Sequence, residues 1–151
     1  MTEIKKIATR DAYGKALAEL AKENSNIFVM DADLSQSTKS VEFAKVCPER
    51  FVNAGIAEGN MIGVAAGLAA MGKTVFASSF AVFVTGRAFE QIRNSVCYPR
   101  LNVKVAGSHS GITVGEDGGT HQAIADISLM RSLPNMTVLV PADATATRWM
   151  V

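Results

Sequence analysis

The chain has 151 residues, of which 48% are hydrophobic, and its formal net charge is +1. This length suits one domain that buries a real core, and the composition excludes a disordered protein. The near-neutral charge gives no basic surface for nucleic acid or an anionic membrane, and the longest mostly apolar run, residues 61–71, is too short to cross a bilayer.

The predicted elements alternate helices with short apolar strands. Residues 9–23 place apolar side chains on one helical face, with Thr9 as the expected N-cap. Further helices are expected over residues 41–46, 80–96 and 122–131, from Glu58 to a stop at Gly72, and from Pro141 onward. The expected strands are residues 27–30, 51–52, 73–77, 101–106 and 136–140, and the expected loops are residues 31–38 and 107–120.

The predicted strands show no alternation of polar and apolar residues, which is typical of a parallel sheet with helices on both faces. The sequence therefore predicts an α/β fold in a single domain over residues 1–151, in which Asp31 is expected only to end a strand. Ligands of such sheets bind beyond the carboxyl ends of the strands. Residue types suited to chemistry collect in the loops at those ends: residues 31–38, 53–58, 78–83, 107–121 and 141–143.

The two cysteines, Cys47 and Cys97, lie far apart and match neither a disulfide framework nor a metal site. We expect them to be buried free thiols in a reducing compartment, which favours a cytoplasmic protein. The chain opens on no signal-peptide pattern, and no metal ligands are expected in it.

A single carboxylate, Glu58, stands between a short apolar strand and a helix of small residues, with no basic residue before Lys73 as a local partner. Gly and Ala dominate residues 63–70, so the helix is expected to be buried all round. Glu58 would then lie at the buried end of a core helix, where desolvation favours the protonated carboxyl group and suits it to acid–base chemistry. The alternative is that Glu58 only complements the positive end of the helix.

The second informative stretch, residues 108–122, contains both histidines, His109 and His121, together with Glu116 and Asp117. Its four glycines let the backbone come close to a ligand. Imidazoles beside a carboxylate can exchange protons with hydroxyl and carbonyl oxygens near pH 7. The alternative is a tight loop of solvated polar residues. The stretch lacks a third metal ligand of the His or Cys type and the lysine of a Walker phosphate loop.

These motifs resemble those of a known family. Gly55-Ile56-Ala57-Glu58, followed by a helix rich in alanine and glycine, resembles the pyrimidine-binding domain of thiamine-diphosphate enzymes of the transketolase type. Residues 115–122 read Gly-Glu-Asp-Gly-Gly-Thr-His-Gln and are similar to the Gly-Glu-Asp-Gly-Pro-Thr-His-Gln signature of transketolases, with Gly119 in the place of proline. The resemblance extends in the same order from about Arg10 to Asp143 and implies thiamine diphosphate as the cofactor.

The resemblance also implies which residues contact the cofactor. Glu58 matches the glutamate that touches the ring nitrogen of the aminopyrimidine and promotes loss of the thiazolium proton. Phe80 and Phe83 match the aromatic wall around that ring, although from the residues alone both would be assigned to the core. Asp33 falls where the family has an aspartate near the thiazolium side. Arg87 follows Phe83 by one helical turn and is a further candidate.

The substrate residues follow from the same resemblance. His109, His121 and Asp117 match positions that contact the hydroxyls and carbonyl of the ketose, and the two histidines are the further catalytic candidates. Arg10 and Ser37 match positions that bind the phosphate of the sugar. Arginine offers phosphate oxygens a planar fork, and the alternative for Arg10 is an exposed residue in the first turn of a helix.

Two departures from the family point to half of an enzyme. Gly59-Asn60 follows Glu58, where most transketolases have His, and this form is associated with split transketolases. The family holds the diphosphate through magnesium on another domain, which carries Gly-Asp-Gly and then Asn, and this chain contains no Gly-Asp-Gly. The resemblance therefore implies a fragment or half-enzyme that needs such a partner, forms a homo- or hetero-oligomer and has little activity alone.

Three functions remain open. The first is the pyrimidine-binding part of a transketolase that moves a two-carbon ketol unit between sugar phosphates. The second is a domain of the deoxyxylulose-phosphate synthase type or of an oxo-acid dehydrogenase beta subunit, against which His109 and the pair Glu116-Asp117 argue. The third is a non-catalytic domain for assembly or regulation, against which the presence of Glu58, both histidines and Asp117 argues.

Overall fold

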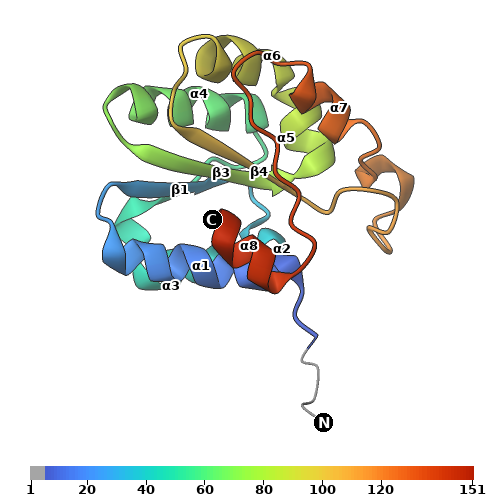
Figure 1. The fold of residues 1–151 in the computed structure, drawn as a ribbon, viewed down its shortest axis with the longest axis horizontal. Coiled ribbons are helices and arrows are strands. Elements are labelled where there is room, and N and C mark those ends of the chain that lie inside the picture. The colour runs from blue at the N-terminus through green and yellow to red at the C-terminus, as the bar shows by residue number, and fades with distance from the viewer. Residues whose placement is uncertain (1–5) are drawn as a thin grey trace.

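A computed structural model describes residues 6–151 and shows one sheet of four parallel strands. The strands are β1 (Ile27–Asp31), β2 (Phe51–Asn53), β3 (Thr74–Phe80) and β4 (Val103–Ser108). They lie in the order β2-β1-β3-β4, so each parallel connection passes over a face of the sheet (Figure 1). The predicted α/β fold with a parallel sheet is confirmed.

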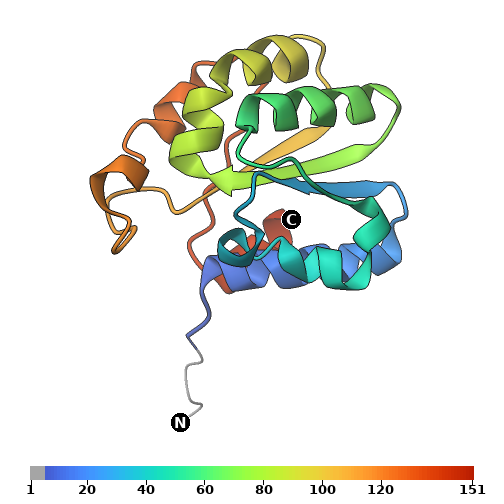
Figure 2. The same cartoon turned by 180° about the vertical axis from the view of Figure 1, so that it is seen from behind.

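Helices cover both faces of this sheet. On one face lie α1 (Thr9–Glu23), α3 (Val41–Val46) and α8 (Ala144–Met150), with the short α2 (Ser35–Thr38) beside them (Figure 2). On the other face lie α4 (Glu58–Ala70), α5 (Ala81–Arg87), α6 (Phe89–Gln91), the π-helical segment η2 (Ile92–Cys97) and α7 (Asp126–Arg131). The remaining short helices are η1 (Pro48–Arg50) and η3 (Gly118–His121).

Each face of the sheet has its own hydrophobic core, because successive strand residues point to opposite sides. Met30 and Val75 pack with α4 and α5, whereas Val29 and Phe76 pack with α1 and α3. All side chains of β3 from Val75 to Phe80 are buried, which agrees with a strand that is covered on both faces. Cys47 and Cys97 are buried and unpaired, as expected. Within the described residues, no helix has the length and apolarity to cross a membrane.

The helix expected over residues 80–96 is three shorter pieces. Phe80 belongs to β3, α5 ends at Arg87, and Ala88 has dihedral angles that interrupt the helix. Beyond α6, the backbone continues as the π-helical segment η2, where the helix has a wider turn. The apolar spacing of residues 80–96 therefore indicated the buried face correctly but not the breaks.

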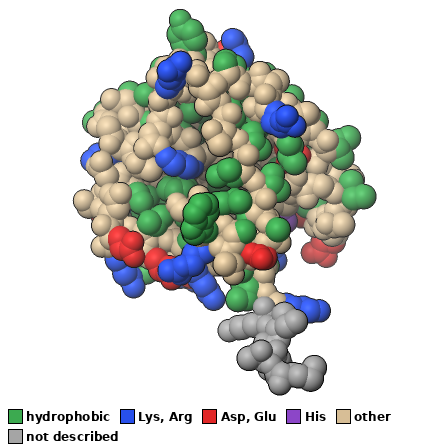
Figure 3. Space-filling model, viewed as in Figure 1, with side chains coloured by type: hydrophobic (Ala, Val, Ile, Leu, Met, Phe, Trp, Pro, Cys, Tyr) green, Lys and Arg blue, Asp and Glu red, His purple; other side chains and the backbone are tan. Residues whose placement is uncertain are grey.

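The expected strand over residues 136–140 is not part of the sheet. Among the described residues, this segment pairs with no strand, and Leu139 and Val140 of the segment line a cavity of about 700 Å³ together with residues of β4. Both side chains are exposed, as is Trp149 of α8, and hydrophobic side chains gather on the face that carries α8 (Figure 3). An apolar run indicates burial, but a strand also needs a hydrogen-bonding partner.

The composition of helix α4 predicted that the helix is buried all round, but one side of it is exposed. Asn60, Gly63, Val64 and Gly67 are exposed, whereas Met61 and its neighbours toward the sheet are buried. The reason is that β3, α5 and the segments after α5 pack against one side of the helix only. The exposed side carries Asn60 together with small or apolar residues.

Three helices begin differently from the prediction. Helix α1 starts at Thr9 itself, and Ala8 holds the N-cap position without a side-chain hydrogen bond. Helix α7 starts later than expected, because Ala123 pairs with Gly111 in an isolated bridge. Helix α8 starts after its expected beginning, where the Asp143 carboxylate accepts a hydrogen bond from a backbone N–H of the first turn.

Gly14 sits where α1 touches the loop that follows α2. A Cβ at Gly14 would lie 2.4 Å from the backbone oxygen of Lys39. We expect Gly14→Ala to lower the free energy of unfolding by about 1 kcal/mol, because the overpacking cost of about 2 kcal/mol exceeds the gain of about 1 kcal/mol in helix propensity. Urea denaturation measures this change. Gly63→Ala is the matched control, since apart from its chain neighbours and the backbone of its own helix no described atom lies within 4 Å of a Cβ there, and it should stabilise the chain. Equal effects of the two substitutions would contradict the contact.

Candidate active site

The expected site residues come together at the carboxyl edge of the sheet. Strand β3 ends at Phe80, and β4 ends immediately before His109. Glu58 is the first residue of α4, which follows β2. Parallel strands all end at the same edge, so residues far apart in the sequence meet there.

Two phenylalanines and two histidines form the centre of this group. The rings of Phe80 and Phe83 are nearly parallel, at 5°, with their centroids 6.1 Å apart. His109 stacks on Phe80 at 4.1 Å, and His121 meets Phe83 edge-on at 5.2 Å. Stacked and edge-on contacts of this kind are favourable for aromatic rings. The four side chains therefore form a preorganised aromatic surface with two imidazoles at its border.

Glu58 adjoins this surface and has a cationic partner. The Glu58 side chain is 3% exposed, and its Oε2 lies 3.5 Å from Nη1 of Arg87. The Arg87 guanidinium lies over the ring of Phe83 at 4.6 Å. Residues one helical turn apart share a face, which is why Arg87 and Phe83 of α5 both reach this place. As expected from the sequence, the cationic partner of Glu58 is not a local one, because Arg87 comes from another helix.

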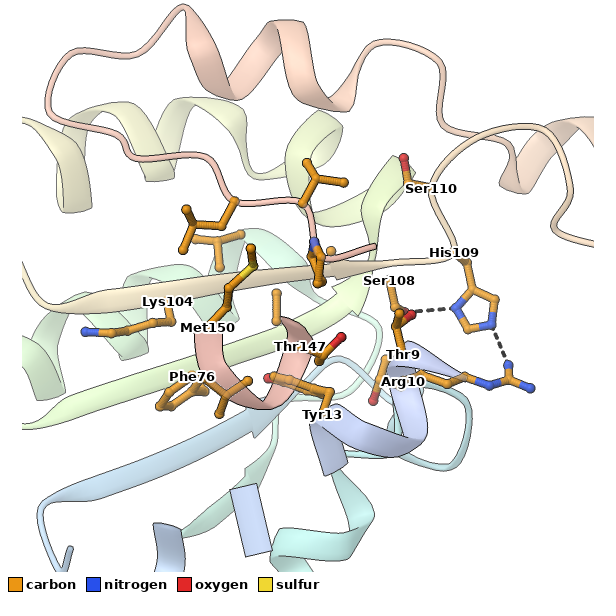
Figure 4. Close-up of a pocket in the computed structure, with 18 of the residues that line it drawn as sticks. Thr9, Arg10, Tyr13, Phe76, Lys104, Ser108, His109, Ser110, Thr147 and Met150 are labelled. Carbon is orange, nitrogen blue, oxygen red and sulfur yellow. Dashed lines mark hydrogen bonds between the residues drawn. The ribbon is translucent and has the colours of Figure 1, made fainter. Parts of the chain in front are cut away.

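His109 is held from two sides. Its Nε2 lies 2.8 Å from Nη1 of Arg10, and its Nδ1 lies 2.9 Å from Oγ of Ser108 (Figure 4). A guanidinium only donates hydrogen bonds, so Nε2 is the acceptor and the proton of the neutral ring lies on Nδ1. Burial lowers the pKa of His109, the Arg10 charge lowers it further, and Asp117 opposes both. His109 is thus a neutral imidazole with its Nδ1–H directed to Ser108.

The other expected site residues lie outside this contact group. Asp33 is exposed at a positive φ of 64° and exchanges two hydrogen bonds of 3.1 Å with Asn53. Ser37 is half-buried in α2, and Asp117 is exposed in the loop before η3. Asp117 reaches the group only through its charge on His109.

Sequence reasoning missed two polar residues at this edge. Asn53 anchors the backbone of Asp33, and Ser108 fixes the ring of His109. Each is the last residue of its strand. A polar residue at the carboxyl end of a parallel strand is the signal that could have found both.

The cavity of about 700 Å³ lies next to the aromatic group, on the side of α1 and α8. Arg10, Ser108 and His109 line one end of it, and the rest is lined both by apolar residues such as Phe76 and Met150 and by polar ones such as Lys104 (Figure 4). Glu58 and Phe83 are not among its lining residues. The cavity and the aromatic group are therefore neighbours that share His109, with Arg10 on the cavity side and Phe83 and Glu58 outside the cavity.

Comparisons with known proteins agree with this geometry. Residues 5–151 match the family described as the transketolase, pyrimidine binding domain. The chain is 59% identical over 139 residues to a putative transketolase C-terminal section of Methanocaldococcus jannaschii. The aligned residues make up 92% of this chain and 44% of that protein. It is 46% identical over 143 residues to human transketolase, and these residues make up 94% of this chain and 23% of that protein.

A solved structure shows the same fold in a close relative. A split-gene transketolase, an inactive beta4 tetramer, is 62% identical with a TM-score of 0.83, over 97% of this chain and 47% of the other. The chain thus spans less than half the length of each of these three relatives. Its sequence and its fold place the chain in the family of transketolase pyrimidine-binding domains.

Proposed function

We propose that this chain is the pyrimidine-binding part of a thiamine-diphosphate-dependent transketolase, which transfers a two-carbon ketol unit between sugar phosphates together with a diphosphate-binding partner. The observation that carries the proposal is the buried carboxylate of Glu58 beside the aromatic surface of Phe80 and Phe83. Stacked rings and a carboxylate fit a flat heteroaromatic base with ring nitrogens, because the rings pack its faces and the carboxylate bonds its edge.

On the cofactor side, each residue has a defined task. Thiamine diphosphate supplies the nucleophilic carbon and the electron sink for breaking a carbon–carbon bond. Glu58 shares a proton between its carboxylate and a pyrimidine nitrogen, and Arg87 orients that carboxylate from 3.5 Å. Phe80 and Phe83 pack the ring and keep water from it, and Asp33 is the further cofactor contact that the family pattern implies.

On the substrate side, the histidines handle protons and the remaining residues bind the sugar. His109 and His121 are imidazoles that can take and return protons of hydroxyl and carbonyl oxygens. Asp117 accepts a hydrogen bond from a sugar hydroxyl. Arg10 and Ser37 bind the phosphate, for which the guanidinium supplies a charged, planar pair of donors.

The partner supplies what the described residues do not. Within residues 6–151, no group of three His, Cys, Asp or Glu is placed to hold a metal ion. We assign magnesium and the diphosphate to a chain or domain that carries Gly-Asp-Gly and a following Asn. The split-gene relative that is an inactive beta4 tetramer supports an oligomer without activity for this half alone. The exposed, small-residue side of α4 is a surface on which such contacts can form.

The isolated chain is expected to bind thiamine diphosphate weakly and without dependence on magnesium. Only the pyrimidine end of the cofactor is held, while the whole loss of translational and rotational freedom opposes binding. Calorimetry with and without magnesium measures both features. Tight, magnesium-dependent binding would reveal a diphosphate site within this chain.

Ketol transfer by the assembled enzyme tests the proposal as a whole. The chain is co-expressed with candidate partners that carry the Gly-Asp-Gly motif, and transfer between a ketose phosphate and an aldose phosphate is assayed. A cofactor-loaded complex that transfers no ketol unit would exclude the transketolase function and leave a related thiamine-diphosphate reaction or the non-catalytic, assembly role.

A further inference from the structure

Asp31, the last residue of β1, is a buried carboxylate that the proposed chemistry does not use. Its side chain is 0% exposed, and among the described residues no ion pair joins it to a lysine or arginine. Burial raises the pKa of Asp31, and the hydrogen bonds it accepts oppose that rise. A buried charge without a cation is costly, so the contacts that retain it are informative.

The carboxylate accepts three hydrogen bonds, and all of the donors come from the loop over residues 34–40. The backbone N–H of Leu34 donates to Oδ1 at 2.6 Å. The hydroxyls of Thr38 and Ser40 donate to Oδ2 at 2.7 and 2.8 Å. The loop therefore closes around Asp31, and helix α2 with Ser37 lies between the bonded residues.

The same loop is pressed against α1. Lys39 has a left-handed backbone with φ of 68°, and its carbonyl approaches Gly14 so closely that a Cβ there would clash at 2.4 Å. Arg10 lies one helical turn before Gly14, on the same side of α1. The contact between Gly14 and Lys39 thus sets the distance between the segment with Arg10 and the loop with Ser37.

A second bond holds α1 against the sheet at this point. The hydroxyl of Tyr13 lies 2.8 Å from Oγ of Ser78, which is the partner of Asp31 in the register of β1 and β3. Burial raises the pKa of Tyr13, so its hydroxyl stays protonated and bonded. Helix α1, β3 and the loop therefore meet around the end of β1.

We propose that Asp31 is a positioning residue, which folds the loop over residues 34–40 so that Ser37 and Arg10 together face the phosphate of the sugar substrate. This inference rests on the proposed function, in which these two residues bind that phosphate. Asp31 itself does not touch the substrate. It acts through the loop, because its carboxylate accepts three hydrogen bonds from loop donors that would bond to water if the loop were free.

Phosphate binding to the isolated chain tests the inference without requiring catalysis. The probe is inorganic phosphate, titrated into ¹⁵N-labelled chain while the backbone NMR signals of Arg10 and Ser37 are followed. Asp31→Ala should weaken binding at least about tenfold, the scale of losing charge-assisted hydrogen bonds that hold a donor in place. Asp31→Asn should restore it, because the amide can accept from Leu34 and donate to the two hydroxyls.

Controls separate positioning from a loss of fold or charge. Glu42→Gln makes the same change in charge as Asp31→Asn but removes none of the three bonds, and should leave phosphate binding unchanged. Thr38→Val removes one bond to Asp31 and the bonds of the same hydroxyl with Ser40, and should weaken phosphate binding partly, even if Asp31→Ala does not fold. The inference would be overturned if folded Asp31→Ala or Thr38→Val bound phosphate as the wild type does. It would also be overturned if phosphate did not change the NMR signals of Arg10 and Ser37 in the wild-type chain.

The assembled enzyme distinguishes this inference from the proposed function. Asp31→Ala should raise the KM for a ketose phosphate about tenfold, whereas the kinetics with an unphosphorylated ketose should change little. An equal loss with both substrates would overturn the positioning role. If no partner gives ketol transfer but phosphate binding still depends on Asp31, the proposed function fails and the positioning role remains.

Discussion

Replacing Glu58 with Gln is expected to slow exchange of the thiazolium proton of thiamine diphosphate at least about a hundredfold in the assembled enzyme, the usual scale for a positioned acid or base. Glu58 is 3% exposed at the start of α4, so its carboxylate acts in a site from which water is largely excluded. An amide keeps the shape of the side chain but cannot share a proton in the same way. Exchange is measured by NMR after transfer of the complex into deuterated water.

The control for this prediction is Glu90→Gln. Glu90 lies on α6 and forms an exposed ion pair of 3.2 Å with Arg93, so the same change in charge is made outside the site. Exchange in this variant should remain normal. A folded, cofactor-loaded Glu58→Gln enzyme with near-normal exchange would remove Glu58 from the mechanism.

Phe83→Ala is expected to weaken cofactor binding to the assembled enzyme by about 1–3 kcal/mol, because stacking and apolar burial are both lost. Asp117→Ala is expected to lower ketol transfer while the affinity for thiamine diphosphate stays almost unchanged. The geometry supports this division, since Phe83 contacts Arg87 and His121 within the group around Glu58, whereas Asp117 is exposed in its loop.

Calorimetry and steady-state kinetics measure the two effects separately. Tyr98→Ala, which removes a ring that is 80% exposed, is the matched control for the aromatic substitution and should alter neither quantity. The assignment of roles fails if Asp117→Ala weakens the cofactor as much as Phe83→Ala does.

Much of the fold followed from local patterns. The apolar runs over residues 27–30 and 73–77 predicted buried parallel strands, and the spacing of residues 9–23 predicted α1, because both features depend on near neighbours in the chain. The segment over residues 136–140 shows the limit. Its apolar run was read as a strand, yet the segment lines a cavity beside β4 instead of pairing with it.

The residues of the candidate site could also be chosen from the sequence. The parallel direction of the strands predicts that the loops after them lie along one edge of the sheet, and the structure joins the ring of Phe80 to those of Phe83, His109 and His121 there. The aromatic rings themselves gave no such signal. Their assignment to the site rather than to the core depended on the resemblance to the transketolase family.

By itself, then, the sequence determined the fold class, the edge of the sheet that carries the site and the residue types that gather there. Only the tertiary structure decided which charges meet: Arg87 with Glu58, and Arg10 with His109. Those pairs join separate elements, and the second spans 99 positions of the chain. Periodicity shows which side of an element is buried, but the partner of a charge depends on how whole elements pack.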